Sequence, residues 1–394
     1  MAVTDFTVDR NTVKYVLNSS GDIASVAIDT PAIEYNTDGT YKGLLVEPAS
    51  TNICKQSEDI NTTWTSGNAS ITTNDTTAPD GNTTADKLGD NSGGGTGYVY
   101  VQQLISGLTA GAKYTASVFL KADGLSFAFF QAEGYDGGTT GQNYFGLSGA
   151  GSVGTASNLD DSSITAYPNG WYRCSITWTQ GAADTSFTLG IYVADSISNV
   201  TVDLDGTSSI FVWGAQIEAS PIATSYIPTT TASVTRNKDD ISLTGASDLI
   251  GQSEGTIYVE VYWRLATGTG QVLLDANDGA INNRLAIFNR NSPVELRMLA
   301  NANGVELFNK GVSSTAYSGI QKIAFAYADS DFELYRNGSS ISTDTTGSLA
   351  ALATLTDIDI GQSFSSGGQA NMWIRAVALY KTRLTNDQLA DLTS

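Results

Sequence analysis

The stretch NGWYRCSITW, residues 169–178, decides the fold class of this chain. Every second residue from Tyr172 to Trp178 is apolar, and the residues between them are polar. A two-residue period is typical of a β-strand with one buried face. The same period recurs at residues 114–120, 187–193 and 211–217, with Gly-, Ser- and Asn-rich turns between the strands. The sequence therefore predicts an all-β fold in which antiparallel sheets pack face to face as sandwiches.

Length and composition limit the number of domains and the kinds of partner. A chain of 394 residues exceeds what one core usually holds, so we expect two β domains and an N-terminal segment. Acidic residues outnumber basic ones 40 to 20, which disfavours nucleic acid and anionic lipid as partners. No stretch reaches the roughly 18 apolar residues of a spanning helix, and Met1 to Arg10 lack the features of a signal peptide. We therefore expect neither membrane insertion nor a secretion signal.

Two residue types limit the chemistry. The chain contains no histidine, which excludes Ser-His-Asp and Cys-His hydrolases and His-ligated metal sites. Cys54 and Cys174 are the only cysteines, too few for a disulfide framework, and we expect both to be buried free thiols. Catalysis would have to use carboxylate, tyrosine or lysine side chains.

Three segments follow from the strand pattern. Residues 1–42 predict a hairpin with strands near residues 13–17 and 23–28. A lone hairpin is marginal in water, so it should pair with a neighbouring chain or lie on the next domain, and it is a candidate anchor. Residues 43–240 form the first predicted sandwich and residues 241–394 the second, because the stretch before the boundary is rich in Thr and charge and lacks an apolar pattern.

The second domain contains the clearest local signals. Alternation over residues 257–263 predicts a strand, and Asn337-Gly338 predicts a type I′ hairpin turn. One short helix is predicted at the C-terminus, where Thr385 and Gln388 form a capping box.

The first domain carries a resemblance to a known family in three ordered blocks: GLLVEPASTN at 43–52, NGWYRCSITW at 169–178 and VWGAQIEASPIATSYIPTTTASVTR at 212–236. With APDGNTTADKL at 78–88, these blocks resemble a module of tail, fibre and other virion proteins of tailed bacteriophages. The module is similar to carbohydrate-binding modules with a jelly-roll fold. The resemblance covers residues 43–236 and implies a jelly-roll β-sandwich in a virion protein, such as a tail fibre or a decoration protein.

The second domain resembles the concanavalin A-like, laminin-G-type sandwich of lectins and glucanases. The matching pieces are GTIYVEVYW at 255–263, KIAFAYADSDFELYRNGS at 322–339, IDIGQS at 358–363 and WIRAVALYKTRLTNDQLADL at 373–392. Members of this family bind glycans, serve as structural domains or act as hydrolases, so the resemblance implies a fold and leaves the activity open.

Trp171 and Arg173 are the first candidate glycan-binding residues. Their strand parity is opposite to that of the apolar residues, so a solvated Trp171 could stack on a sugar ring. Arg173 or Asn169 would then supply hydrogen bonds. The alternative is that Trp171 packs beneath a loop or against the N-terminal segment, because large aromatic residues are mostly buried.

The glycine-rich stretch 134–144 is the second candidate. Tyr135, Asp136, Asn143 and Tyr144 offer two aromatic rings, a carboxylate and an amide. This combination suits a glycan site, and it also suits an ordinary wide turn.

No motif requires a cofactor, and a structural calcium ion is the metal that would fit best, because the available ligands are oxygen atoms. Asp203 and Asp205 lie on one side of a short predicted strand, and Asp357 and Asp359 repeat that spacing. The same pattern is also typical of a solvated face or turn.

Catalysis is not expected, because the E-x-D-x-x-E strand motif of glucanases with the concanavalin A-like fold is missing from the sequence. The combined prediction is a virion surface appendage, a fibre, tip or decoration protein, that adheres to host-surface polysaccharide without cutting it. One alternative is a purely structural decoration or assembly protein without glycan binding, and another is a carboxylate-dependent depolymerase. We expect synthesis in the host bacterial cytoplasm, attachment to other virion proteins through residues 1–42, and a homo-oligomer, with a trimer favoured.

Overall fold

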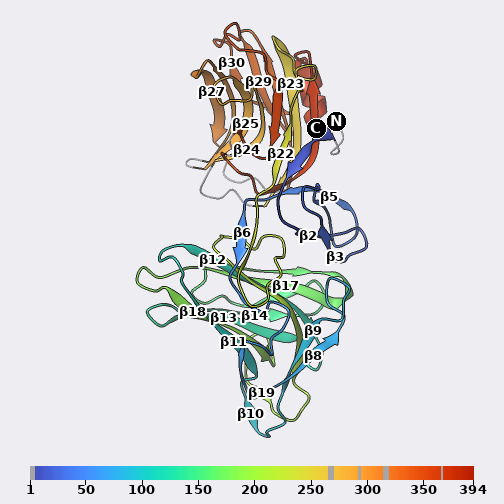
Figure 1. Cartoon of the computed structure of the whole chain (residues 1–394), viewed down its shortest axis with the longest axis vertical. Coiled ribbons are helices and arrows are strands. Elements are labelled where there is room, and N and C mark those ends of the chain that lie inside the picture. Colours follow the sequence, from blue (N-terminus) through green and yellow to red (C-terminus); the bar gives the residue numbers. More distant parts are fainter. Residues whose placement is uncertain (1–4, 265–269, 292–293, 314–318, 365–366) are drawn as a thin grey trace.

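The computed structural model describes residues 5–264, 270–291, 294–313, 319–364 and 367–394. They form two β-sandwiches, one above the other, with the N-terminal segment at the junction between them (Figure 1). Nearly all regular structure is antiparallel strand, and the α-helix α1 (Asn386–Thr393) lies at the C-terminal end. This arrangement confirms the predicted all-β class. None of the described helices is long and apolar enough to cross a membrane.

The first sandwich consists of two six-stranded antiparallel sheets. The β13 sheet has the order β15 (Ser152–Val153), β14 (Thr139–Gly146), β13 (Phe127–Asp136), β18 (Ser186–Ala194), β11 (Tyr100–Ser106) and β7 (Thr65–Gly67). The β17 sheet has the order β16 (Asp161–Ala166), β17 (Trp171–Thr179), β12 (Lys113–Ala122), β20 (Ser209–Glu218), β9 (Ala85–Asp90) and β8 (Ala69–Thr76). Their facing sides share one core, in which Val118, Cys174 and Ile191 are fully buried. The predicted apolar alternation therefore points into this core.

The second sandwich consists of two seven-stranded sheets. One has the order β1 (Thr7–Asp9), β22 (Asp240–Leu243), β31 (Asp357–Ile360), β24 (Gln271–Asn277), β25 (Arg284–Asn291), β26 (Val294–Ala302) and β27 (Val305–Ser313). The other has the order β30 (Ser339–Asp344), β29 (Asp331–Arg336), β28 (Ile320–Ala328), β23 (Glu254–Trp263), β32 (Met372–Tyr380), β5 (Tyr41–Val46) and β4 (Ile33–Tyr35). Asn337-Gly338 turns β29 into β30, and Thr385 caps α1 with Gln388, as predicted.

Residues 43–46 are predicted to begin the first sandwich, but in the structure they belong to the second. They belong to β5, which pairs with β32, and β1 likewise pairs with β22. Leu44 and Val46 face the second core, whereas Leu45 packs beside Trp373 on the opposite side. A strand that is apolar on both sides gives no sign in the sequence of which sandwich it joins. The chain enters the first sandwich only at β6 (Ser50–Asn52), which pairs with β21 (Val234–Arg236).

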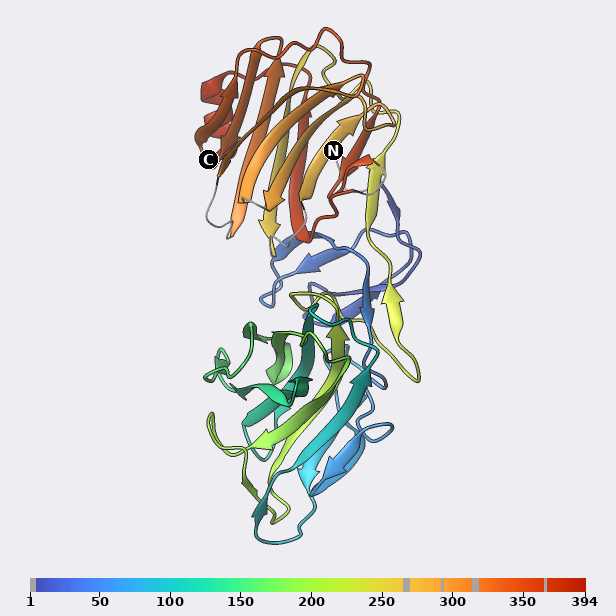
Figure 2. The same cartoon turned by 90° about the vertical axis from the view of Figure 1, so that its left-hand side faces the viewer.

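The predicted N-terminal hairpin is present as β2 (Lys14–Leu17) and β3 (Ile23–Val26). It lies between the two sandwiches (Figure 2). Leu17 and Ile23 pack on the β17 sheet, and Val16 packs against Trp373 of the second sandwich. Of the two predicted placements, the structure therefore has the hairpin lying on the neighbouring domains of its own chain. Pairing with another chain stays a prediction.

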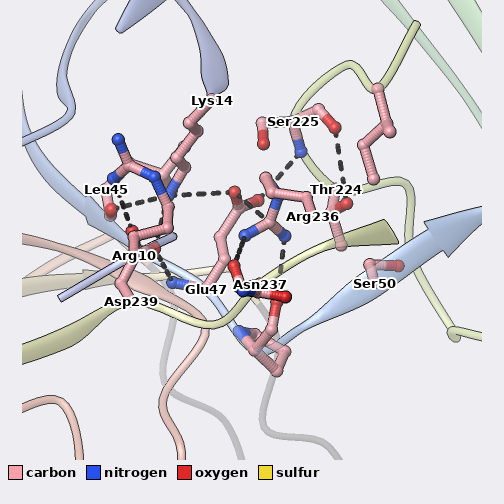
Figure 3. A network of polar contacts seen from close by, with 12 residues as sticks. Arg10, Lys14, Leu45, Glu47, Ser50, Thr224, Ser225, Arg236, Asn237 and Asp239 are labelled. Atoms are coloured by element: carbon pink, nitrogen blue, oxygen red, sulfur yellow. Dashed lines mark hydrogen bonds and ion pairs between the residues drawn. The ribbon is translucent and has the colours of Figure 1, made fainter. Parts of the chain in front are cut away.

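Charged side chains meet where the N-terminal segment and both connections between the sandwiches converge (Figure 3). Lys14 Nζ lies 2.6 Å from Asp239 and 3.1 Å from Glu47, and Arg10 lies 2.8 Å from Asp239. Burial alone raises the pKa of Glu47, but neighbouring cations outweigh it and hold that pKa well below its usual range. We call the following residues the junction cluster: Arg10, Lys14, Glu47, Arg236, Asp239 and Arg264. In this cluster, four cations share the two carboxylates of Glu47 and Asp239.

Candidate functional site

Trp171 is covered, so the predicted solvated position is wrong. Its side chain is 1% exposed, and its indole N–H donates to the Thr77 carbonyl at 3.1 Å. The ring does point outward from the β17 sheet, but Leu17 and Ile23 of the hairpin pack over it. The structure therefore matches the alternative in which Trp171 packs against the N-terminal segment, because a distant part of the chain covers this face.

Arg173 is half-buried on the same outer face and lines a cleft toward the second sandwich. Its guanidinium lies 5.4 Å from the centre of the Phe119 ring, and Nη2 donates to Ser117 Oγ at 3.0 Å. Asn169 lies in the turn before β17 with a φ of 60°. With Trp171 buried, these residues have no exposed indole to assist.

The stretch 134–144 is a tight hairpin that joins β13 to β14, and its predicted site residues separate onto different sides. Tyr135 faces the core and donates to the Asn158 carbonyl at 2.5 Å. Asn143 is fully buried and donates to Ser162 Oγ at 2.8 Å, whereas Asp136 is exposed beside the turn. Tyr144 alone points to the outer face of the sheet, where it packs with Phe129. A pleated strand sends neighbouring residues to opposite faces, so these four side chains cannot form one site.

Tyr144 belongs to a row of aromatic side chains that crosses four strands of the β13 sheet. The register aligns Tyr144 with Phe129, Phe129 with Tyr192, and Tyr192 with Tyr100. Ring centres lie 4.7 Å apart for Phe129 and Tyr144, 5.4 Å for Phe129 and Tyr192, and 4.9 Å for Tyr100 and Tyr192. We call this surface the aromatic face. Phe129 and Tyr192 are buried by their neighbours, at 4% and 8% exposed, and the half-buried Tyr100 and Tyr144 present the exposed ring surface.

Two glycine residues let two of these rings lie down on the sheet: Gly67 on the strand next to Tyr100, and Gly190 two residues before Tyr192 on the same strand. A Cβ atom at Gly67 would overlap the Tyr100 ring, and a Cβ atom at Gly190 would lie 2.6 Å from the Tyr192 ring. Larger residues at either position would force the rings upright or aside. The aromatic face is therefore flatter than an ordinary cluster of strand aromatics.

A row of amides runs beside the aromatic row, two residues further along each strand. The register places Gln102 opposite Gly190, Gly190 opposite Gln131, and Gln131 opposite Gln142. Gln131 donates to the Tyr192 hydroxyl at 2.8 Å and so fixes that ring. Within the described residues, the side-chain amides of Gln102 and Gln142 make no hydrogen bond. The face thus combines flat rings with donors and acceptors that remain available.

Two tyrosine hydroxyls of this face, those of Tyr192 and Tyr144, have a raised pKa. Burial, reinforced by Glu133 and the neighbouring tyrosines, raises the pKa of Tyr192 to about 12. Burial and Tyr98 likewise raise the pKa of Tyr144. Tyr98 is 53% exposed and directly follows β10 (Thr96–Gly97), which pairs with β19 (Val202–Asp203) at the end farthest from the second sandwich (Figure 1). The aromatic face therefore begins near the outer end of the molecule.

Sequence reasoning missed every ring of this face except Tyr144. A signal exists, because Tyr192 has the opposite parity to the core residues Ile191 and Val193. Phe129 likewise neighbours the buried Phe130, which makes β13 apolar on both sides. Two-sided apolar strands in a sandwich indicate an outer face with a function or a cover.

The predicted calcium ligands do not form a carboxylate cluster. Asp203 and Asp205 are exposed, and Asp205 accepts from Thr207 in a local turn. Asp359 accepts from Asn277 at 2.7 Å, and Asp357 accepts from neighbouring backbone and hydroxyl groups. Among the described residues, no three carboxylate or thiol side chains are grouped so that they could hold a metal ion. Calcium binding stays a prediction.

Two carboxylates of the second sandwich lie directly opposite each other on β24 and β31. Burial, offset in part by Arg284 and reinforced by Asp359, raises the pKa of Asp275 to about 7. Burial, offset in part by Asn277, raises the pKa of Asp359 to about 6. Asp275 is fully buried and pairs with Arg284 at 3.2 Å, so a polysaccharide cannot reach it. The pair lacks the access that an acid and base for glycoside hydrolysis need.

No protein-family model matches the chain, and no curated protein is significantly similar to it. Among solved structures, part of the chain is similar to the CBM40 domain of a Ruminococcus gnavus IT-sialidase. The identity is 14%, the match covers 38% of this chain and 87% of that one, and the TM-score is 0.33. Botulinum neurotoxin type C, whose cell entry depends on interaction with two ganglioside molecules, is 15% identical over 40% of each chain, with a TM-score of 0.33. At such TM-scores, these similarities decide neither the fold of a sandwich nor the ligand of this chain.

Proposed function

We propose that this protein binds glycans without cutting them and that the aromatic face is its binding surface. The observation that carries this proposal is the row of Tyr100, Tyr192, Phe129 and Tyr144 beside a row of amides. Flat aromatic rings stack on the apolar faces of sugar rings, and neighbouring amides and phenols supply hydrogen bonds to sugar hydroxyls. The aromatic face offers both kinds of contact on one rigid sheet.

The dimensions of the face suit an oligosaccharide better than a single sugar. Neighbouring strands lie about 4.8 Å apart, so the four strands of the row span about 14 Å. The amide row runs parallel to it at about 7 Å, which is two residues along each strand. An extended chain of a few sugars lying along the rings would reach amides on several strands at once.

Binding without catalysis is part of the proposal. Hydrolysis of a glycosidic bond needs two carboxylates about 5 to 10 Å apart, one of them held protonated. Glu133 is the carboxylate on β13 near the rings, four residues from Phe129. Its partners on the adjacent strands are Thr140 and Thr188. Hydroxyl groups there can bind a sugar but cannot replace the second carboxylate.

We further propose that the protein is displayed on a tailed-bacteriophage virion as a fibre, tip or decoration protein, on the strength of the sequence resemblance. The aromatic face begins beside β10, at the outer end of the first sandwich, where it could meet a host surface (Figure 1). Exposed Val13 and Ile28 in residues 1–42 are available for attachment to other virion proteins or for a homotrimer. The chain is then made in the host cytoplasm and carried into the virion by assembly.

A glycan array with host-surface polysaccharides tests glycan binding. The purified chain should bind at least one polysaccharide, and a Tyr100→Ala/Tyr144→Ala double variant should bind it about 10-fold more weakly, because stacking on the two rings together contributes about 1 to 3 kcal/mol. Tyr41→Ala is the matched control, since Tyr41 is a 41% exposed tyrosine on the second sandwich.

Three outcomes would contradict the proposal. If the wild-type chain binds no glycan on the array, a purely structural decoration protein is favoured. Equal binding by the double variant would move the site away from the aromatic face. Release of new reducing ends from a bound polysaccharide would show cleavage and favour a depolymerase function.

A further inference from the structure

A cleft of about 370 Å³ lies between the β17 sheet and the second sandwich. One wall is the outer face of β16 and β17, and the opposite wall comes from β4, β5, β23 and β32. The β2–β3 hairpin closes one side. Pockets for small molecules typically measure about 300 to 1,000 Å³, so the cleft has room for one or two sugar rings. It is distinct from the aromatic face, which belongs to the other sheet.

The first-sandwich wall of the cleft is rich in hydroxyl groups. The register of β16 and β17 aligns Thr165 with Arg173, Ser163 with Ser175 and Asp161 with Thr177. Ser163 and Ser175 lie at the middle of this ladder, with 2.8 Å between their hydroxyl oxygens. Each hydroxyl can both donate and accept, which suits the hydroxyl groups of a sugar.

Arg173 supplies the positive charge of this wall, and Asp161 supplies a negative one. The Nε of Arg173 is buried and has no hydrogen-bond partner, while Nη2 donates to Ser117. No acidic side chain of the described residues forms an ion pair with it. The guanidinium also bonds the Tyr167 hydroxyl, and because Nε is buried, a ligand could reach Arg173 only where its side chain lines the cleft. The planar guanidinium matches a carboxylate better than a single hydroxyl.

The other charges that face the cleft are already paired or distant. Lys42 Nζ lies 3.8 Å from Glu34, and Arg264 pairs with Glu47 of the junction cluster. Asp161 is aligned with Thr177, four residues along the strand from Arg173, which corresponds to about 13 Å. In the described part of the chain, Arg173 is therefore the cleft cation that lacks a carboxylate.

We propose that the cleft binds an acidic sugar, with its carboxylate on Arg173 and its hydroxyls on Thr165, Ser163 and Ser175. This site does not depend on glycan binding at the aromatic face, because the two surfaces belong to different sheets and share no residue. Its position between the sandwiches would let the second sandwich close over the sugar ring from the opposite wall.

Calorimetric titration with three simple probes tests the proposal. D-glucuronate carries the ring and the carboxylate, D-glucose carries the ring alone, and acetate carries the carboxylate alone. We expect wild-type protein to bind glucuronate at least 10-fold more tightly than either partial probe, and Arg173→Gln to lose at least 10-fold in affinity. Lys113→Gln is the control, because Lys113 lies on the same sheet and makes an exposed ion pair with Asp160.

The outcomes separate this site from the aromatic face. Glucuronate binding should survive in the Tyr100→Ala/Tyr144→Ala variant, and its loss there would place the acidic sugar on the aromatic face. Glucose binding as tightly as glucuronate, or unchanged affinity in Arg173→Gln, would overturn the proposal, as would no heat of binding up to about 10 mM glucuronate. If near-UV circular dichroism shows that Arg173→Gln is misfolded, Ser163→Ala/Ser175→Ala replaces it and should weaken binding several-fold.

Discussion

The two outer faces of the first sandwich both carry aromatic side chains, but their surroundings differ. On the β17 sheet, Trp171 and Trp213 are each 1% exposed beneath the β2–β3 hairpin. On the β13 sheet, Tyr100 and Tyr144 are half-buried beside the buried Phe129 and Tyr192, and Tyr98, just before β11, is 53% exposed. An outward aromatic residue therefore marks a candidate binding surface on the second of these faces, whereas on the first it serves to dock another part of the chain.

The largest loss of stability is expected from a mutation in the junction cluster, next to the covered face of the β17 sheet. Glu47→Gln should lower the free energy of unfolding by about 3 to 5 kcal/mol, because Lys14, Arg236 and Arg264 lose their shared carboxylate in a buried place. Urea unfolding followed by tryptophan fluorescence measures this loss.

Asp160→Asn is the matched control for Glu47→Gln. It removes the exposed ion pair with Lys113, which is worth less than about 1 kcal/mol. Equal losses in the two variants would show that the junction cluster does not hold the covered face together.

Trp171→Ala should cost about 3 kcal/mol, because it leaves a cavity between the hairpin and the β17 sheet. The folded variant should keep its glycan affinity, since Trp171 lies on the other sheet from the aromatic face. Thermal unfolding and the glycan array measure the two effects. A variant that stays stable but loses glycan binding would reverse the roles assigned to the two faces.

The second sandwich also has a buried residue on an outer face. Asp275 points away from the core and is still fully buried. Its folded pKa of about 7 lies above the unfolded value near 3.9. The folded state therefore holds its proton longer, and stability should fall as pH rises from about 4 to about 7, then level off. Between pH 5 and 8, wild type should lose about 1 to 3 kcal/mol relative to Asp275→Asn, as measured by urea midpoints. A constant difference across this range would contradict the raised pKa.

The smallest effect on stability is expected on the open face. Tyr98→Ala should change the free energy of unfolding by less than about 0.5 kcal/mol, because the side chain is mostly exposed. Its glycan affinity should still fall several-fold if the ring extends the aromatic row. Thermal unfolding with a parallel binding titration checks both, and unchanged affinity would confine the site to the four aligned rings.

The sequence predicts the strands well, because period-2 alternation at residues such as Tyr172 to Trp178 reflects burial directly. It also predicts the β29–β30 turn and the cap of α1, which depend on local chemistry. It does not reveal that β5 joins the second sandwich or that the hairpin covers Trp171. Both facts depend on contacts between residues far apart in the chain, and strand periodicity carries no information on them.

The candidate site likewise depends on contacts that the sequence does not reveal. Parity places Tyr144 on an outer face, but the alignment with Phe129, Tyr192 and Tyr100 depends on the pairing of four strands. Parity also places Arg173 on an outer face, and only the structure adds that it lines a cleft without an ion-pair partner among the described residues. Register and long-range cover therefore decide which outward residues can meet a ligand.

Oxidative footprinting of tyrosines, read by mass spectrometry with and without the polysaccharide identified on the array, tests the central claim most directly. Exposed Tyr98 and half-buried Tyr100 and Tyr144 should become protected by the bound polysaccharide, whereas Tyr41 on the second sandwich should react equally in both samples. Protection of Tyr41 without protection of Tyr98, Tyr100 and Tyr144 would contradict the assignment of the aromatic face as the glycan-binding surface.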